Sequence, residues 1–356
     1  MQHIRGFHAL RAFSVLLVIV SHIGITEAAT SPYLVTFFTV FNAKYGVKTF
    51  FVLSGFLITT ILIKEAERTG RIDIRSFITK RAFRILPLYY LIIAIAIVLV
   101  LLGIAEPSWN GMAFGTFLAY NFVPQRHNVN YLSHLWSLAV EEQYYLFWPL
   151  IFAWFVDRKT ALIGVCIAFL LICYAFLDRD FGHLSAKFST SLWTIPAIYP
   201  ISTGSLLALL VSEDRRKLLG SGAALASSAI LIALPLFVPP QPLVEIASTL
   251  GIAGIIAWIY LNQSNRVVQS LDWKPLFFIG QISYGLYMWQ GLLTGNGPYR
   301  PFPGFPLDPA IGAVLTLPIA TASFFLFEVP ISNIGRRWLA TMANVGRLPP
   351  TSIPLQ

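Results

Sequence analysis

The chain has 356 residues, of which 56% are hydrophobic and only 12% charged, and its mean hydropathy is +0.69. Soluble domains usually carry about 25% charged residues, so this composition excludes a water-soluble globular domain. The net charge of +9 does not indicate nucleic-acid binding, because the basic residues lie in short segments between apolar runs and form no basic domain. The composition therefore predicts an integral membrane protein whose main partner is the lipid bilayer.

Ten apolar segments can be placed along the chain, most of them close to the roughly 20 residues that cross a bilayer. They cover residues 8–26, 46–63, 84–104, 134–156, 160–177, 192–211, 218–237, 243–262, 275–293 and 309–328. The fold class predicted is all-α, with about ten transmembrane helices in one bundle. Cys166 and Cys173 are seven residues apart in one run, which is about 10 Å along a helix. That spacing is too long for a disulfide, so both are interpreted as packing residues.

The segments between the apolar runs alternate in basic charge. One alternate set holds 18 Lys and Arg residues, and the other holds only five, namely Lys44, Arg126, Arg179, Lys187 and Arg300. Because basic residues favour the cytoplasmic side, an even number of spans with this bias predicts that both termini are cytoplasmic. We accordingly expect a membrane domain over residues 1–335, a short cytoplasmic tail over 336–356 and no appended soluble domain.

The stretch 105–133 differs from the rest of the chain. It is rich in Pro, Gly, Asn and aromatic residues, and its apolar piece from Gly111 to Phe122 is too short to cross a bilayer. A re-entrant or interfacial segment on the outer side fits this length.

Polar residues stand inside the first two apolar segments. Arg11 and His22 are eleven residues apart, which on a helix is about 16 Å of rise and about 20° of rotation, so they share one face. A charged residue inside a span normally faces a partner or a wet cavity, although Arg11 can also reach the inner headgroups. In the second segment, Lys48 fits either a functional site or an interface anchor, while Ser54 and Gly55 also suit close helix packing.

Basic and acidic residues cluster beside the third and fourth segments. Arg81 and Arg84 are helical neighbours next to Lys80, and guanidinium groups suit phosphate contacts, although cytoplasmic charge alone also explains basic residues here. In the fourth segment, His134, Ser137 and Glu141 share one helical face, with Glu142 one step round. Two adjacent carboxylates in an apolar span must be protonated or paired, and Arg11 and Lys48 are the structural partners considered.

Six motifs together resemble the acyltransferase-3 family of bacterial membrane acyltransferases, which includes polysaccharide O-acetyltransferases and Nod-factor acetyltransferases. The resemblance covers essentially the whole chain. The motifs are the Arg11/His22 spacing, G-V-K-T-F-F-V-L-S-G-F from Gly46, K-R-x-x-R-I-x-P from Lys80, H-L-W-S-L-A-V-E-E-Q-Y-Y from His134, and the closing pair G-Q-I-S-Y-G-L-Y-M-W-Q and F-E-V-P…R-R.

The resemblance implies a multi-pass enzyme of the bacterial inner membrane that moves an acyl group, usually acetyl, from cytoplasmic acyl-CoA to a hydroxyl of a carbohydrate or glycolipid at the outer face. Acyl-CoA is then a co-substrate, and no metal or permanently bound cofactor is implied. The catalytic residues implied are His22, Glu141 and Glu142. The donor-binding residues implied are Arg11, Lys80, Arg81 and Arg84. The acceptor chamber implied is lined by Lys48, Ser54, His134, Trp136, Ser137, Tyr284 and Tyr287.

We expect the basic donor site on the inner side and His22, His134 and the two glutamates toward the outer side. His22, made basic by a nearby carboxylate, then removes the proton of the acceptor hydroxyl. An acyl-His intermediate and a succinyl donor fit equally well. Gln290 departs from the family pattern, since many members have His at that position.

The rival interpretation is a polytopic transporter or exporter of a polar or lipid-linked sugar, with the buried charges as a proton or substrate path. The clustering of polar residues at span ends disfavours it, because transporter sites usually lie at the bilayer midplane. A purely structural role gives no reason to keep carboxylates in the bilayer.

Overall fold

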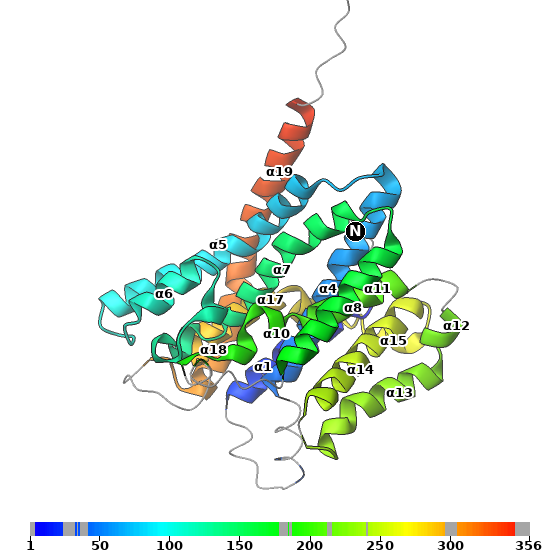
Figure 1. The fold of residues 1–356 in the computed structure, drawn as a ribbon. Helices are drawn as coiled ribbons and strands as arrows, with labels where there is room; N and C mark the ends of the chain where they lie inside the picture. The colour runs from blue at the N-terminus through cyan, green and yellow to red at the C-terminus, as the bar shows by residue number, and fades with distance from the viewer. Residues whose placement is uncertain are drawn as a thin grey trace, which may run out of the picture.

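The computed structural model describes residues 4–23, 33, 35, 42–177, 184, 187–211, 216–239, 241–295 and 305–345. Throughout these residues the protein is helical and contains no β-strand, with one isolated bridge between Pro124 and Phe188. The all-α prediction is therefore confirmed. Figure 1 shows α1 and α4 near the middle of the bundle, α13 and α14 at one edge and α6 at the opposite edge.

The principal helices, in chain order, are α1 (Phe7–His22), α4 (Ala43–Thr69), α5 (Ile74–Leu101), α6 (Trp109–Thr116), α7 (Leu135–Trp154), α8 (Lys159–Leu177), α10 (Thr194–Ala197), α11 (Tyr199–Leu210), α12 (Arg216–Leu219), α13 (Gly222–Ala233), α14 (Pro242–Leu261), α15 (Arg266–Ser270), α16 (Lys274–Gln281), α17 (Ser283–Thr294), α18 (Pro309–Ser323) and α19 (Val329–Val345). Short 3-10 turns lie at Tyr120–Phe122, Gln125–His127, Asn130–Leu132, Thr190–Leu192 and Leu234–Leu236, and a π-helical turn at Phe324–Glu328 joins α18 to α19.

Five described helices are long and apolar enough to cross a bilayer: Ala43–Thr69, Ile74–Leu101, Lys159–Phe176, Pro242–Leu261 and Pro309–Leu339. Shorter apolar helices cover Phe7–His22, Tyr199–Leu210 and Gly222–Leu236. The chain is thus a multi-pass membrane protein. The count of ten spans and the cytoplasmic placement of both termini stay predictions.

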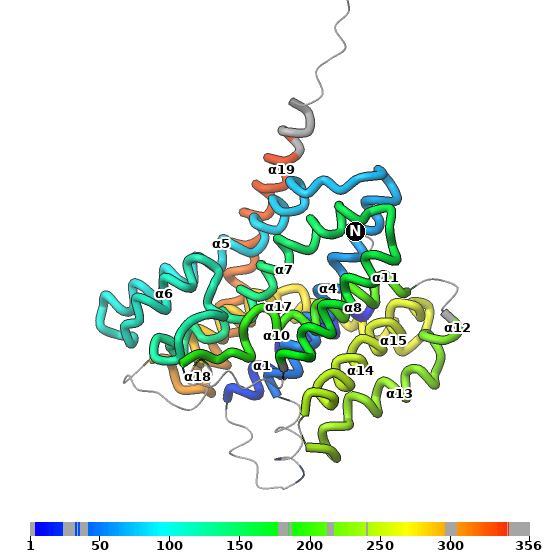
Figure 2. The backbone as a smooth tube through the Cα atoms, viewed as in Figure 1, coloured from blue at the N-terminus to red at the C-terminus, as the bar shows by residue number. Residues whose placement is uncertain are grey.

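Several predicted boundaries differ from the structure, most clearly those of the third, ninth and tenth segments. Helix α5 begins at Ile74, ten residues before the predicted segment, because the Asp73 side chain accepts the backbone N–H of Ser76 at 2.9 Å and caps the helix there. The segment 275–293 divides into α16 and α17 around Ile282. Helix α19 continues to Val345, so the predicted tail begins inside a helix that projects from the bundle (Figure 2). Residues 24–26, 296–304 and 346–356 lie outside the described residues.

Helices α4 and α11 lie in backbone contact through two glycines. A Cβ added to Gly55 would lie 1.9 Å from the carbonyl oxygen of Ile201, and one added to Gly204 would lie 1.9 Å from that of Val52. Only glycine allows such an approach, and small residues are the usual means of close helix packing in membranes. The packing interpretation of Gly55 is confirmed. The contact fixes α4, whose opposite face lines the candidate site.

Helix α7 is held to α4 and α11 by buried hydrogen bonds. The fully buried Trp148 donates its indole N–H to Thr59 Oγ1 at 2.9 Å, and Tyr144 donates to Ser205 Oγ at 2.8 Å. These bonds satisfy polar groups that would otherwise be costly to bury. On α8, Cys166 and Cys173 are free and buried, as the sequence predicts.

The stretch 105–133 folds into α6 and three 3-10 turns. Helix α6 has only eight residues, about 12 Å, which is too short to cross a bilayer. Tyr89 of α5 donates to the carbonyl oxygen of Gly115 at 2.7 Å and so ties α6 to the bundle. The apolar piece Gly111–Phe122 thus forms the end of a short helix and a 3-10 turn, and its re-entrant or interfacial character stays a prediction. Its placement on the outer side stays a prediction.

Candidate active site: two adjoining cavities

One cavity of about 440 Å³ lies among α1, α4, α5, α7 and α17, and we call it the arginine cavity. Its apolar wall comes mainly from α4. Its polar lining is formed by His8, Arg11, Ser54, Arg81, Arg84, Ser137, Glu141, Tyr145, Ser283, Tyr284 and Tyr287. Three guanidinium groups therefore face one space, although Arg11 is about seventy residues from the other two in sequence.

The three arginines differ in how far they are paired. Arg81 lies 3.5 Å from a Glu141 oxygen and 3.6 Å from a Glu142 oxygen, and its guanidinium carbon is 2.9 Å from the centre of the Tyr145 ring. Arg11 donates from Nε to Ser283 Oγ at 3.2 Å. Among the described residues, no carboxylate oxygen lies within 4 Å of Arg11 or Arg84. The residues that line the cavity thus carry three guanidinium groups against one carboxylate, that of Glu141, and this excess of positive charge suits an anionic ligand.

Glu141 accepts hydrogen bonds from Ser54, at 2.5 Å, and from Tyr145. Ser137 and Glu141 both line the arginine cavity, so their predicted common face is confirmed. Two other expectations are wrong. The acids pair with Arg81, not with Arg11 or Lys48, and Glu141 lines the arginine cavity, whereas neither acid lines the His22 cavity. The reason is that α5 starts early and carries Arg81 on a helix alongside α7.

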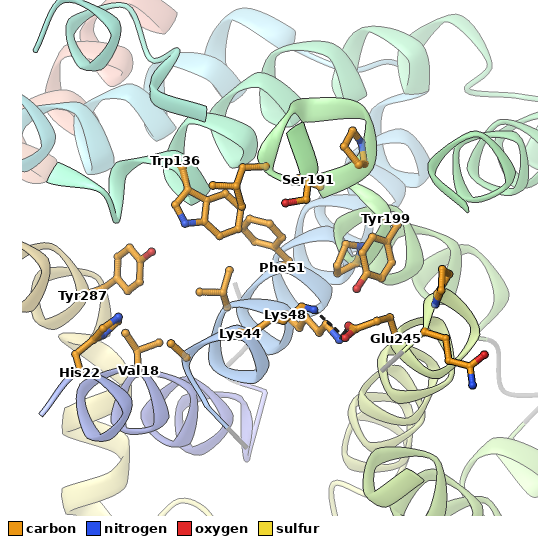
Figure 3. A pocket seen from close by; sticks show the side chains of 18 residues that line it. Val18, His22, Lys44, Lys48, Phe51, Trp136, Ser191, Tyr199, Glu245 and Tyr287 are labelled. Carbon is orange, nitrogen blue, oxygen red and sulfur yellow. Dashed lines mark hydrogen bonds and ion pairs between the residues drawn. The ribbon is translucent and has the colours of Figure 1, made fainter. Parts of the chain in front are cut away.

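A second cavity of about 630 Å³ lies at the other end of α1, and we call it the His22 cavity. Figure 3 shows His22, Tyr287 and Trp136 toward one end, Lys48 and Glu245 toward the other, and Phe51 between them. Segments of α1, α4, α7, α11, α14 and α17 and the turn before α10 contribute to its wall. The cavity therefore combines aromatic surface with a few charged groups.

Lys48 is an ion-pair partner, not a lone interface anchor. Its side chain is only 5% exposed, and its ammonium group is paired with Glu245 of α14 and lies 3.3 Å from Ser248 Oγ. The other oxygen of Glu245 lies 2.7 Å from the Lys44 ammonium. A buried ammonium group needs such a partner, because leaving it unpaired would cost several kcal/mol.

His22 is the last residue of α1 and lines this cavity together with apolar residues such as Val18, Val47 and Trp136. Its Nδ1 has no hydrogen-bond partner of normal geometry among the described residues. The only carboxylate lining this cavity in the described part of the chain is Glu245, which is engaged by two lysines. Among the described residues, the structure therefore provides no free carboxylate beside His22, and the expectation that one makes His22 basic stays a prediction.

The two cavities share a wall. Val47 and Phe51 of α4 and Tyr287 of α17 line both of them. Tyr287 donates to the carbonyl oxygen of His134 at 3.0 Å, and its hydroxyl lies 2.6 Å from Ser137 Oγ. These contacts hold the phenol at the boundary, so a ligand group passing from one cavity to the other would pass Tyr287.

His134 and Gln290 pack behind this boundary. His134 is 2% exposed, its ring lies 5.8 Å from that of Tyr287, and neither ring nitrogen has a partner among the described residues. A Cβ at Gly291 would lie 2.1 Å from the His134 ring, so glycine is required there. Gln290 is fully buried and donates to Thr294 Oγ1 at 2.5 Å, and it lines neither cavity.

The other predicted site residues are distributed between the two cavities, and Lys80 lies in neither. Trp136 lines the His22 cavity, while Ser54 and Tyr284 line the arginine cavity, where Tyr284 donates to the carbonyl oxygen of Ile85 at 2.7 Å. Lys80 is exposed and lines neither cavity. Sequence reasoning missed Glu245 and Tyr145. Glu245 is the single acid of the segment 243–262, which is a signal that could have marked it as the partner of Lys48.

Residues 4–332 match the family model described as an acyltransferase domain, acyltransferase type 3. The match covers most of the chain, so the protein belongs to the acyltransferase-3 family. The family resemblance inferred from the motifs is thereby confirmed.

Three curated relatives illustrate the family. A putative peptidoglycan O-acetyltransferase, YrhL, of Bacillus subtilis is 27% identical over 98% of this chain and 58% of its own length. The O-acetyltransferase OatA of Staphylococcus aureus is 28% identical over 94% of this chain and 58% of its own. The peptidoglycan O-acetyltransferase OatA of Listeria monocytogenes is 27% identical over 94% and 56%. This chain thus spans a little over half the length of these relatives. No solved structure matches it.

Proposed function

We propose that the protein is a membrane O-acyltransferase that moves an acyl group, acetyl in the first instance, from cytoplasmic acyl-CoA to a saccharide hydroxyl presented at the outer face of the bacterial inner membrane. The observation that carries the proposal is the pair of adjoining cavities, one rich in arginine and one containing His22, which share Val47, Phe51 and Tyr287. A cytoplasmic donor and an external acceptor need two such sites with a common boundary.

The arginine cavity suits the donor. Arg11 and Arg84 have no carboxylate within 4 Å in the described structure, so a phosphate group can bind them without first displacing an ion-pair partner. Arg81 is held in place by Glu141 and Glu142 and by the ring of Tyr145. A preorganised guanidinium loses less freedom on binding an anion, which favours affinity. The acids serve here as positioning residues for Arg81.

The His22 cavity suits the acceptor and the chemistry. As a neutral imidazole, His22 accepts the proton of the acceptor hydroxyl while that oxygen attacks the carbonyl carbon of the thioester. The C–O bond forms, the C–S bond breaks, and CoA leaves as a thiolate that takes up a proton. Attack by His22 itself, with an acyl-His intermediate, uses the same geometry. The apolar side chains around His22 limit the access of water to the thioester, which slows its hydrolysis.

The names of the relatives make peptidoglycan the first acceptor to test. The purified chain in lipid nanodiscs is given acetyl-CoA with and without soluble peptidoglycan fragments, and free thiol and labelled acetyl on the glycan are measured together. We expect thiol release that depends on the glycan. Uptake of a sugar driven by a pH gradient, with no thiol released for any acceptor, would instead support a transporter.

A further inference from the structure

The end of the His22 cavity farthest from His22 carries a net positive charge. Lys44 and Lys48 line it from α4, and Glu245 lines it from α14 (Figure 3). Two ammonium groups against one carboxylate leave one positive charge. Glu245 is the only acid lining this cavity within the described residues.

The surplus charge is located at Lys44. Lys48 and Glu245 form the more buried pair, with side chains 5% and 20% exposed. Lys44 contacts the other oxygen of Glu245, but its side chain is 61% exposed. An incoming anion can therefore take Lys44 as a partner while Lys48 keeps Glu245, so that no buried charge is left alone.

The surrounding backbone adds to this positive potential. Helices α4 and α14 both begin at the cavity, since Ala43 and Lys44 at one start and Gln241 and Pro242 at the other are lining residues. The N-terminus of a helix carries a partial positive charge that favours anions. Glu245 in the first turn of α14 offsets part of that charge, whereas the first turn of α4 contains no acid.

The opposite end of the cavity presents aromatic surface. Phe51 and Trp136 meet edge to face with ring centres 6.1 Å apart, next to His22 and Tyr287. Aromatic rings present an apolar face that the C–H face of a sugar ring can cover. The cavity thus has an aromatic floor near the proposed base and a cation at its far end.

We infer that the acceptor is an acidic saccharide, whose carboxylate binds Lys44 while the sugar ring covers Phe51 and Trp136 and places a hydroxyl at His22. The inference deepens the proposed function and rests on it. A carboxylate fits better than a phosphate group, because a single surplus positive charge balances a monovalent anion.

The test compares matched acceptors in the thiol-release assay. A muramyl disaccharide with a free lactyl carboxylate is set against its neutral methyl ester and against an analogue in which a phosphate group takes the place of the carboxylate, and kcat/KM is measured for each. We expect the wild-type protein to prefer the acid to the ester by at least about tenfold, and to use the phosphate less well than the acid. Lys44→Met should lower the acid-to-ester ratio to near one, Lys44→Glu should invert it, and Lys44→Arg should keep it.

Lys64→Met is the matched control, because Lys64 is an exposed lysine on the same helix, about 30 Å away along its axis. It should leave the ratio unchanged. Equal use of acid and ester by the wild-type protein, or a Lys44→Met ratio equal to the wild-type ratio, overturns the inference and leaves the acyltransferase proposal standing. A preference for the phosphate overturns the carboxylate assignment. Absence of thiol release with every acceptor overturns the proposed function and this inference together.

Discussion

The two cavities solve the problem of buried charge in different ways. In the arginine cavity, Glu141 and Glu142 pair with Arg81, while Arg11 and Arg84 are left for a ligand. In the His22 cavity, Glu245 pairs with two lysines at the far end, and none of the described residues gives His22 a charged partner. The first arrangement suits the binding of an anion, and the second keeps charge away from the group proposed to carry protons. Donor binding and proton transfer are thus assigned to opposite ends of α1, near Arg11 and at His22.

The largest loss of activity is expected from His22→Ala. A positioned general base contributes about 10² to 10⁴ in rate, so kcat should fall by that factor while the protein still folds. Thiol release and acetyl transfer are measured on the purified variant in nanodiscs. Retention of more than a tenth of the wild-type kcat contradicts the assigned role.

The packing that supports both cavities is tested by Gly204→Ala. Since a Cβ there would meet the Val52 carbonyl oxygen at 1.9 Å, α4 must shift, and α4 lines both cavities. We expect little folded protein and no activity, measured by size-exclusion elution and thermal unfolding. Gly164→Ala is the control, because nothing lies within 4 Å of an added Cβ there and stability should be equal or about 0.5–1 kcal/mol higher. Normal folding of Gly204→Ala would show that the α4–α11 contact is looser than described.

Comparing Arg84 with Lys80 tests whether the arginine cavity is the binding site of the acyl donor. A hydrogen bond to a charged group contributes about 1.5–3 kcal/mol, so Arg84→Met should raise the KM for acetyl-CoA about 10- to 100-fold. Lys80 is exposed and outside the cavity, so Lys80→Met should raise it by less than about fivefold. Equal effects of the two variants would favour general surface charge over a defined donor cavity.

The ion pair of the His22 cavity is tested through stability. Glu245→Gln leaves the buried Lys48 without a carboxylate. Breaking a buried pair costs about 3–5 kcal/mol, and less is expected here because Glu245 is 20% exposed. The double variant Lys48→Met/Glu245→Gln should recover much of the lost thermal stability. Additive destabilisation in this double-mutant cycle would mean that the two side chains do not interact.

The smallest change in activity is expected from a substitution of Tyr287, at the boundary between the two cavities. Tyr287→Phe removes the hydroxyl that bonds to His134 and Ser137, a change of about 0.5–1.5 kcal/mol. Loss of that positioning should lower kcat about two- to tenfold while the KM for the donor stays constant. A change in donor KM without a change in kcat would place Tyr287 in the donor site alone.

Much of this comparison could be predicted from the sequence, because helical periodicity decides which residues of one helix share a face. That periodicity places Ser137 with Glu141 and Arg81 with Arg84, and each pair lines the arginine cavity. Periodicity does not say which helix stands opposite. Lys48 and Glu245 are 197 residues apart, and Arg81 reaches Glu141 only because α5 begins earlier than its apolar run. Pairing between distant helices is decided by packing such as the Gly55–Gly204 contact.

The central claim is that the donor binds among the arginines and the chemistry takes place at His22. Equilibrium binding of CoA to the purified wild-type, His22→Ala and Arg84→Met proteins, measured by calorimetry, tests it most directly. We predict a wild-type Kd for His22→Ala, which has lost transfer, and a Kd about 10- to 100-fold weaker for Arg84→Met. Equal weakening by both variants, or undiminished binding by Arg84→Met, contradicts the separation of the two cavities.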